Sequence, residues 1–560
     1  MRVVLKSLTT PAALLSIGIL VLCIVLIACH NKISTSLWRG LCFVPLVLCI
    51  VHALCYPFGK QWLNQLIWFG PMYLLAVLLA LWQFAEGKPI LWRVAAVAVT
   101  VLAVVNFIYI PTSMPVKTHL HCYTRGSWAD SFVKTLRTMQ KEYPLSDWKG
   151  INYDALEAEF LPRVQAAERK NDEAELGVVL YDFTQQFHDG HIGLGVANNE
   201  IAAEVTKMLH GNDYGLSLIT PDSGEVIAVN VEPGSEAEAA GIRTGTVITH
   251  WDGVPVQEAK QSFAMPFQPP VKENEEPART MLLAGQGGER VSVTFLGEDA
   301  QPKTVQLSRI GNYQTRFDRT CNRFYHTGND KNFSAKMVSD TCGYLLIHAE
   351  DLGALETAYA WITGKAPFIS KRVDRILTEL QAQGMESLII DIRNNTGGHP
   401  QVSAAVAALF TGESRIYSRF SDGETAKEVS MAVTGNGKWK ELPVVVLVNQ
   451  NTVSAGDALA LMLADCDNVT LMGMTHTNGS CQNTGGICVL AGGHYTIYYP
   501  AFLEVDATGD PFIDTDASRV SRIPLDVRIP LDAAAAEKMY TDESYDHELA
   551  YALNWLQEQP

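Results

Sequence analysis

The chain has 560 residues, of which 48% are hydrophobic, and it carries 43 basic against 60 acidic residues, a net charge of −17. This length predicts three or four domains. Residues 1–115 hold seven Lys or Arg and one acid, Glu86, so 36 basic and 59 acidic residues follow, a net charge of −23. Such an acidic body is not expected to bind nucleic acid or anionic lipid.

The first 115 residues contain four long apolar segments, at 11–29, 40–56, 65–84 and 90–110. A helix of roughly 20 apolar residues crosses the hydrocarbon core of a bilayer. We therefore predict a four-helix transmembrane domain over residues 1–114 and an integral protein of the cell membrane. A cleaved signal peptide explains the first segment less well, because three more apolar segments follow it. The segments hold hardly any ionisable residues in their apolar cores, which favours an anchor over a transporter.

The charges beside these segments favour an extracytoplasmic position for the rest of the chain. Cytoplasmic loops near 31–39 and 86–93 would put four basic residues on the inner side against three on the outer side, as the positive-inside rule prefers. These residues are Lys32, Arg39, Lys88 and Arg93 on one side and Arg2, Lys6 and Lys60 on the other. Six cysteines follow the apolar segments, and either disulfides or buried thiols would account for them.

Residues 115–205 predict a small helical domain. The stretches SWADSFVKTLRTMQKEYP and NYDALEAEFLPRVQAAERKNDEAELGVVLYDFTQQF space their apolar residues at three and four positions, as amphipathic helices do. The second stretch runs into HDGH, where Gly190 ends the helix.

Residues 206–312 instead contain short strands between turns: DYGLSLI, EVIAVNVEP, TVITHWDGVPV and RVSVTFLG. Their order around the small helix PGSEAEAAGI resembles a PDZ domain. The resemblance implies that an extended peptide adds to a sheet edge and that backbone N–H groups capture its C-terminus. The loop for this role comprises Tyr214, Gly215, Leu216, Ser217 and Leu218. A module that only packs against its neighbours is the alternative.

Residues 313–560 predict an α/β domain, because strands such as ESLIIDIR and PVVVLVNQ alternate with amphipathic helices. Sites in open α/β sheets gather at the carboxyl ends of strands. Two such ends carry polar residues, DIRNNTGGHP and NQNTVSAGD.

Ser454 lies between an apolar strand and a helix, where a serine is either a helix cap or a nucleophile. The first N–H groups of a helix have no partner within it, so the N–H of Ala455 is available to a negative charge. Gly397 or Gly398 can adopt backbone angles that aim a second N–H at the same point. Acyl transfer also needs a base and a group that orients the base.

The segment IIDIRNNTGG resembles the DLR-x-N-x-GG segment of tail-specific (C-terminal processing) and tricorn core serine peptidases. VNQNTVSAGDALA resembles their nucleophile segment, and the PDZ-like module stands where this family places its own. The resemblance covers roughly residues 125–530. It implies a crotonase/ClpP-like α/β catalytic core, Ser454 as the nucleophile, and an oxyanion hole from Gly397 or Gly398 with Ala455. No cofactor is implied.

The base distinguishes two branches of this family. The tail-specific branch uses a lysine, but here Asn478 in THTNGSCQ stands at that position, and no lysine lies between Lys440 and Lys538. The tricorn-like branch uses a histidine from a DGH segment, which FHDGHIGL matches with His191. A neutral imidazole is available at physiological pH. A surface role for this histidine, or a metal site formed with His188, is the alternative, although no third ligand is evident.

The acid that would orient the base is the least defined part. The family's glutamate corresponds to Asp514 in FIDTDASRVSRIPLDVRIPL, and Asp516 lies two residues further on. An aspartate is shorter by one methylene, so the backbone must come closer or a water must bridge the gap. Asp457 is expected to be a helix-start charge or a partner behind the site.

These inferences predict a membrane-anchored serine endopeptidase that hydrolyses unfolded or C-terminally exposed polypeptides through an acyl-enzyme on Ser454. The alternative is a catalytically inactive, peptidase-like scaffold that binds peptides or a small hydrophobic ligand. The expected partners are a polypeptide substrate and the lipid bilayer.

Overall fold

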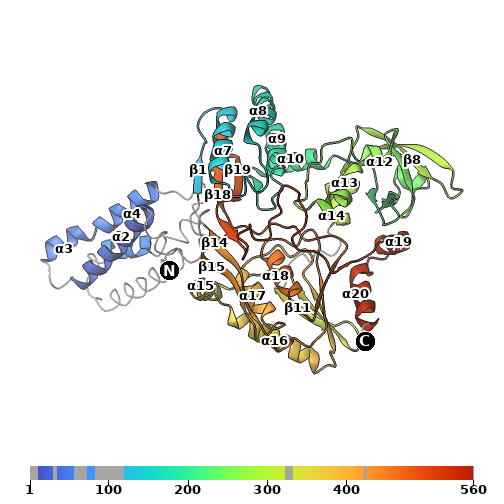
Figure 1. Cartoon of the computed structure of the whole chain (residues 1–560). Coiled ribbons are helices and arrows are strands. Elements are labelled where there is room, and N and C mark those ends of the chain that lie inside the picture. The colour runs from blue at the N-terminus through green and yellow to red at the C-terminus, as the bar shows by residue number, and fades with distance from the viewer. Residues whose placement is uncertain are drawn as a thin grey trace. The chain divides into compact units, whose positions relative to one another are not determined.

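The computed structural model describes residues 11–29, 34–55, 72–81, 119–321, 332–421 and 426–558 (Figure 1). The chain divides into two compact units. The first comprises Met1–Thr118 and Gly353–Gly364, and the second comprises His119–Leu352 and Lys365–Pro560.

The described part of the first unit is helical. Its helices are α2 (Pro11–Ala28), α3 (Thr35–Leu41), α4 (Val44–Cys55), the helix Met72–Leu81 and α15 (Ala354–Thr363). Apolar residues from the first four of these share one core, including Ile19, Trp38, Cys49 and Leu75. Within the described ranges, Thr35–His52 is the one helical stretch long and apolar enough to cross a membrane. The span predicted at 90–110 lies outside the described residues, so the four-helix anchor stays a prediction.

The second unit begins with a helical layer. Its helices are α7 (Trp128–Glu142), α8 (Tyr153–Lys170), α9 (Glu173–Gln185) and α10 (Asn199–His210). Each begins at a polar side chain that accepts an N–H of the first turn, which stabilises a helix by about 1 kcal/mol. These caps are Ser127, Asn152, Asp172 and Asn198. Phe132, Phe160 and Phe183 fill the space between the helices with edge-to-face contacts.

The sheet beneath these helices joins distant parts of the chain. Its strands, in the order β1-β18-β19-β2, are β1 (His119–Cys122), β18 (Thr484–Val489), β19 (Tyr495–Pro500) and β2 (Gly193–Val196). A short turn, η2 (Ala491–Gly493), connects the two central strands, and Tyr495 and Tyr499 lie in the core of the helical layer. The region predicted as a separate helical domain, 115–205, therefore shares its sheet with a hairpin from the predicted α/β domain.

Residues 212–321 form a module with its own apolar core. Its elements are β3 (Asn212–Asp213), β4 (Ser217–Ile219), β5 (Ile227–Val229), α11 (Glu236–Ala239), β6 (Ile248–Trp251), β7 (Val254–Pro255), α12 (Val256–Ala259), η1 (Lys272–Asn274), α13 (Glu275–Leu283), β8 (Arg290–Leu296), β9 (Pro302–Ser308), β10 (Gly311–Asn312) and α14 (Gln314–Cys321). The pairing of β3 with β10 closes the module where the chain enters and leaves it.

The remaining residues form an α/β domain around a six-stranded sheet. The strands, in spatial order, are β11 (Phe333–Met337), β12 (Cys342–Ile347), β13 (Ser387–Asp391), β16 (Val444–Leu447), β17 (Val469–Gly473) and β21 (Val527–Arg528). All neighbours are parallel except β11 and β12. The predicted alternation of strands and helices is confirmed, since a helix follows each of β12, β13 and β16 in the chain.

Helices cover both faces of this sheet (Figure 1). The helices of the domain are α16 (Pro367–Gln381), α17 (Pro400–Ala407), α18 (Ala455–Ala464), α19 (Ala533–Thr541) and α20 (His547–Glu558). The first three share a large apolar core with one face, and α20 packs on the other face. A small separate sheet contains β14 (Ser414–Ser421), β15 (Ala426–Thr434) and β20 (Leu503–Val505).

The parallel pairing of β13 with β16 brings the two polar strand ends together, because Asp391 is opposite Leu447. Side-chain amides then join the two turns. The Asn394 N–H donates to Asn449 Oδ1 at 2.9 Å, and Asn394 Oδ1 accepts from Asn449 Nδ2 at 3.0 Å. The sheet therefore fixes the relative position of the glycine turn and the serine turn.

The cysteines of the described residues are free thiols, and burial raises the pKa of the Cys466 and Cys488 thiols to about 12. Burial also raises the pKa of Cys481 well above its ordinary value. The disulfide alternative is therefore not realised in this part of the chain.

Arg393 holds the end of β13 against the C-terminal helix. Its guanidinium is 4% exposed and contacts Asp391 at 2.6 Å, Asp546 at 2.6 Å and Glu548 at 2.9 Å. Removing one partner of a buried ion pair leaves uncompensated charge inside the protein. The position of the glycine turn therefore depends on this arginine.

Replacing Arg393 by Ala is expected to lower the free energy of unfolding by about 3–5 kcal/mol, because three acids lose their shared cation. Arg375→Ala is the matched control, since the ion pair of Arg375 with Glu379 is exposed on both sides. That control should cost less than about 1 kcal/mol. Urea denaturation followed by circular dichroism measures both, and equal losses would contradict the assigned role.

Candidate active site

Ser454 occupies a strained backbone position between β16 and α18. Its φ is 65° and its ψ is −124°. Residues other than glycine rarely adopt this backbone conformation, which costs about 1–3 kcal/mol. Its N–H donates to the carbonyl of Ser480 at 3.0 Å and to Asp457 Oδ2 at 3.1 Å. Strain of this kind, held by surrounding hydrogen bonds, is typical of a functional residue rather than of an ordinary helix cap.

Asp457 fastens the serine turn to the loop 477–480. Its carboxylate is fully buried and accepts the N–H of Gly479 at 3.0 Å and of Ser480 at 3.3 Å, in addition to that of Ser454. Burial raises the pKa of this carboxyl to about 7, although the hydrogen bonds it accepts lower it. These contacts agree with the predicted role of Asp457 behind the site.

The glycine turn packs directly on the serine turn. A Cβ on Gly397 would lie 2.7 Å from Ser454 Cβ and 2.8 Å from the nitrogen of Ala455. The Gly397 N–H is engaged, because it donates to Asn395 Oδ1 at 2.8 Å. The N–H groups of Gly398 and Ala455 have no acceptor among the described residues. Of the two glycines predicted for an oxyanion hole, the geometry favours Gly398.

The loop that carries His191 lies against the same 477–480 loop. The Gly190 N–H donates to Ser480 Oγ at 2.8 Å across 290 residues of sequence. A Cβ on Gly190 would come within 2.2 Å of Asn478 Oδ1, so a larger residue here would require the Asn478 amide to move. Ser480 therefore touches the histidine loop with its hydroxyl and the serine turn with its carbonyl.

The ring of His191 is held without a hydrogen bond in the described structure. Its Nδ1 is buried and has no partner there, and burial lowers the pKa of the imidazole. Its backbone N–H donates to Asp189 Oδ1 at 2.8 Å, and the Tyr143 hydroxyl donates to Asp189 Oδ2 at 2.7 Å. Catalytic hydrogen bonds are often long or absent without substrate, so this geometry is compatible with a general base.

The two candidate acids differ sharply in surroundings. Asp514 is fully buried, and its Oδ2 accepts the N–H groups of Cys481 at 2.9 Å and Gln482 at 3.1 Å. Its Oδ1 is buried and has no partner among the described residues. Burial and, after it, the charge of Asp189 raise the pKa of this carboxyl to about 8. Asp516 instead caps its own turn by accepting the N–H of Ser518 at 2.8 Å, so the geometry favours Asp514.

Three further buried groups belong to this region and were not anticipated from the sequence. Asp189 stands within HDGH but was read only as the neighbour of His191. Glu350 lies behind the glycine turn, where it accepts from Asn395 Nδ2 at 3.0 Å and where burial raises its pKa to about 8. Lys149 is 8% exposed and donates to the carbonyl of His188 at 3.0 Å. An isolated acid or lysine carries no local pattern that would have revealed it.

A metal-binding role for His188 and His191 has no support in the described residues, which contain no group of three or more potential ligands. His188 lies at a φ of 46°, its Nδ1 has no partner among these residues, and burial lowers its pKa to about 4.

The segment predicted to capture a peptide, Tyr214–Leu218, is buried in this structure. Helix α14 covers it. The Thr320 hydroxyl donates to Ser217 Oγ at 2.8 Å, and Arg316 Nε donates to Asp213 Oδ1 at 2.8 Å. In this conformation a peptide has no access to the N–H groups of the segment.

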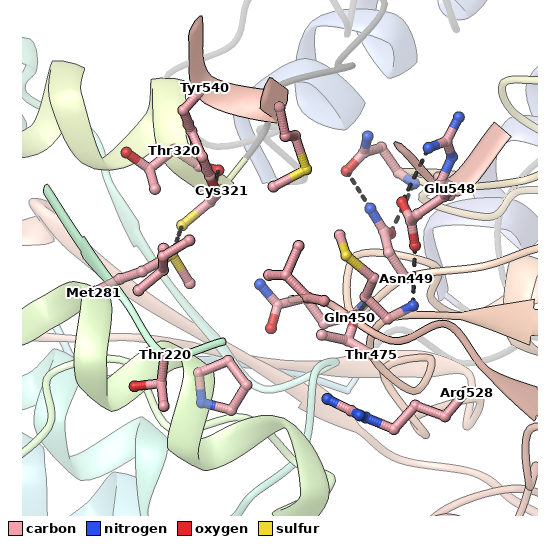
Figure 2. Close-up of a pocket in the computed structure, with 17 residues that line it drawn as sticks. Thr220, Met281, Thr320, Cys321, Asn449, Gln450, Thr475, Arg528, Tyr540 and Glu548 are labelled. Atoms are coloured by element: carbon pink, nitrogen blue, oxygen red, sulfur yellow. Dashed lines mark hydrogen bonds and ion pairs between the residues drawn. The ribbon is translucent and has the colours of Figure 1, made fainter. Parts of the chain in front are cut away.

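A cavity of about 150 Å³ lies where the module meets the α/β domain and the C-terminal helices. Figure 2 shows Met281 and Cys321 on one side and Asn449 and Gln450 on the other. None of Ser454, His191 and Asp514 lines it. The cavity is therefore a neighbour of the candidate site and not the site itself.

A strained serine between strand and helix, with free backbone N–H groups beside it, is an arrangement suited to acyl transfer. The fold and the turn therefore define a serine hydrolase of the α/β class. The comparisons with known proteins agree. The model of peptidase family S41 matches residues 361–489.

Relatives of known function extend over more of the chain. The chloroplastic C-terminal processing peptidase of Tetradesmus obliquus is 25% identical over 420 residues, which is 70% of this chain and 80% of that protein. The carboxyl-terminal-processing protease of Picosynechococcus sp. is 26% identical over 287 residues, 48% of this chain and 58% of that one. A crystal structure of mature CPAF has a TM-score of 0.50 at 15% identity, covers 77% of this chain and 98% of its own, and shows similarity of fold. Residues 361–489 therefore match peptidase family S41, and the chain is a serine peptidase similar to carboxyl-terminal-processing proteases.

Replacing Gly397 by Ala is expected to lower the rate of Ser454 acylation at least about 100-fold, because the added methyl collides with the serine turn and displaces the N–H of Ala455. Gly224→Ala is the matched control. Gly224 has a φ of 82°, close to the 86° of Gly397, but a Cβ there would meet nothing within 4 Å. Labelling by a fluorophosphonate measures the rate, and equal effects of the two variants would contradict the collision.

Proposed function

We propose that this serine peptidase is a membrane-anchored endopeptidase of the histidine-using, tricorn-like branch. Ser454 attacks the peptide carbonyl, His191 is the general base, Asp514 orients the imidazole, and the N–H groups of Gly398 and Ala455 stabilise the oxyanion. Its substrates are unfolded or C-terminally exposed polypeptides. The alternative, an inactive scaffold that binds peptides or a small hydrophobic ligand, is an outcome of the experiment below.

The observation that carries this proposal is the double contact of Ser480. Its hydroxyl accepts the N–H of Gly190, and its carbonyl accepts the N–H of Ser454. One residue thus separates the loop of the candidate base from the turn of the candidate nucleophile. A histidine with only a surface role would not need this long-range contact.

The unpartnered atoms support the same assignment. His191 Nδ1 and Asp514 Oδ1 are both buried without a partner in the described structure. Buried polar atoms without partners cost about 1–3 kcal/mol each, and a hydrogen bond between these two would remove both costs. It would also fix the tautomer that leaves Nε2 free to take the serine proton.

The chemistry then follows from the surroundings. Burial lowers the pKa of His191, so the imidazole is neutral and able to accept a proton at pH 7. The imidazolium that forms is stabilised by Asp189 and Asp514, and it returns its proton to the leaving amine. His191 then takes a proton from water, the water oxygen attacks the acyl carbon, and the Ser454 oxygen leaves and receives that proton from His191.

Two features support the choice of substrate and location. Relatives named carboxyl-terminal-processing proteases act on polypeptide ends, and we extend this to the present chain. The apolar helix Thr35–His52 supplies a membrane anchor, with the acidic second unit on the extracytoplasmic side.

Replacing Ser454 by Ala or His191 by Ala is expected to reduce cleavage of a disordered protein at least about 10³-fold, because each variant removes a group that acts in the chemical step. His250→Ala in β6 is the control and should retain activity. A fluorophosphonate should label the wild type at Ser454. A wild type that is neither labelled nor active would identify the inactive scaffold instead.

Capture of a C-terminus by Tyr214–Leu218 requires α14 to move away. The apparent affinity for a peptide is then the affinity of the open form multiplied by the fraction of molecules in which the segment is uncovered. Arg316 makes the main polar contacts that hold α14 in place, because it pairs with both Asp213 at 2.8 Å and Glu232 at 2.9 Å. The covered segment therefore describes a closed form of the module.

Replacing Arg316 by Ala is expected to strengthen binding of a peptide with a free C-terminal carboxylate by about tenfold, since it favours the open form. Fluorescence anisotropy of a labelled apolar peptide measures the affinity, and an amidated peptide shows whether the carboxylate is recognised. Arg309→Ala is the control, because the pair of Arg309 with Glu289 at 3.5 Å is exposed. Unchanged or weaker binding in Arg316→Ala would contradict a covering role for α14.

A further inference from the structure

Lys149, in the segment between α7 and α8, connects two loops of the candidate site. Its ammonium donates to the carbonyl of His188 at 3.0 Å, to the carbonyl of Thr515 at 3.0 Å and to Thr515 Oγ1 at 3.4 Å. His188 precedes the candidate base by three residues, and Thr515 directly follows the candidate acid. The same amine therefore holds the loop of His191 and the loop of Asp514.

The neighbouring residue strengthens the connection to the acid. The Trp148 indole N–H donates to the carbonyl of Asp514 at 3.0 Å, and the Trp148 carbonyl accepts the N–H of Ala517 at 3.1 Å. Trp148 and Lys149 of the helical layer thus bind backbone groups of Asp514, Thr515 and Ala517. The loop of the candidate acid is therefore held from outside the α/β domain.

The burial of this charge is costly, and no carboxylate pairs with it directly. Lys149 is 8% exposed, and among the described residues it forms no ion pair within 4.0 Å. An ammonium has three donors, and here neutral oxygens take all of them. Transfer of a charge out of water costs several kcal/mol, so a structural purpose alone would be served better by an apolar side chain.

The charge acts on both titrating groups of the site in a useful direction. The Lys149 ammonium lowers the pKa of Asp514 and the pKa of His191, and so favours the form of each that catalysis needs. Other groups also act on this cluster. Asp189 and Asp457 raise the pKa of Asp514, and Asp189 raises that of His191. Arg519 lowers and Glu275 raises the pKa of His188, and the Tyr143 hydroxyl donates to Asp189. Lys149 is the cation that the two catalytic candidates share.

We propose that Lys149 is a positioning residue of the peptidase reaction, which holds the His191 and Asp514 loops together and places a positive charge near both side chains. This inference rests on the proposed function, in which these two side chains are base and orienting acid. It assigns to the helical layer a direct part in the chemistry, through a charge and not only through packing.

The test measures the rate of fluorophosphonate labelling at Ser454 in the full chain between about pH 5 and pH 9. Lys149→Met is expected to lower the rate about 10- to 100-fold through misplacement of the base. It should also shift the acidic limb of the pH–rate profile to higher pH by about one unit. The sign follows because loss of the cation raises the pKa of both groups, and both must be deprotonated.

Three variants separate charge from packing. Lys149→Arg keeps the charge and the donors and should restore the limb. Lys149→Gln keeps donors but not charge and should shift the limb as Lys149→Met does, which protects the test if the methionine variant folds poorly. Trp148→Phe removes the indole hydrogen bond without changing charge, so it should lower the rate and leave the limb in place. Far-UV circular dichroism and the melting temperature confirm folding of each.

A limb that stays in place in Lys149→Met and Lys149→Gln would overturn the inference, whether or not the rate falls. A wild type that is not labelled at Ser454 would instead overturn the proposed function, and the inference with it. The two failures differ in the wild-type result and are therefore distinguishable.

Discussion

The site depends on the polar contacts of Ser480, which accepts one hydrogen bond from the loop of His191 and one from the turn of Ser454. Because its N–H is in turn bound by the buried Asp457, the loop 477–480 cannot shift without moving the serine turn. In this loop Asn478 stands where the resemblance to the tail-specific branch would place a lysine. The same stretch of chain lies between the loop of His191 in the helical layer and the turn of Ser454 at the end of the sheet.

The electrostatics of the region follow from the burial of its carboxyl groups. Asp457, Asp514 and Glu350 are all buried, and burial raises the pKa of each toward neutrality. In such surroundings an added charge has large effects, because the effective dielectric constant is low. One buried cation, Lys149, therefore influences groups that it does not touch. The surface charges that dominate the composition, by contrast, are screened by water and salt and contribute little.

Control of access has a separate origin in the module at 212–321. There the Thr320 hydroxyl of α14 donates to Ser217, Arg316 of α14 donates to Asp213, and the hydroxyl of Tyr313, just before the helix, also donates to Ser217. The proposed opening of this helix and the proposed chemistry at Ser454 involve different residues, so the two proposals can be tested independently. The cavity between the module and the α/β domain lies beside both regions, and movement of α14 would change its wall, since Thr320 and Cys321 line it.

The sequence determined what local pattern can determine: the apolar N-terminal region, the alternation of strands and helices around β13 and β16, the serine before α18 and the glycine turn opposite it. Hydrophobic periodicity and turn residues act over a few positions, so they can be recognised directly in the sequence. Only the tertiary structure decided that β18 and β19 join the sheet of the helical layer, that α14 packs against Tyr214–Leu218, and that Lys149 contacts the loops of both His191 and Asp514. Those contacts join residues up to 366 positions apart, as between Lys149 and Thr515. Their free energy comes from burying groups together, and no neighbouring residue in the sequence records which distant partner will be there.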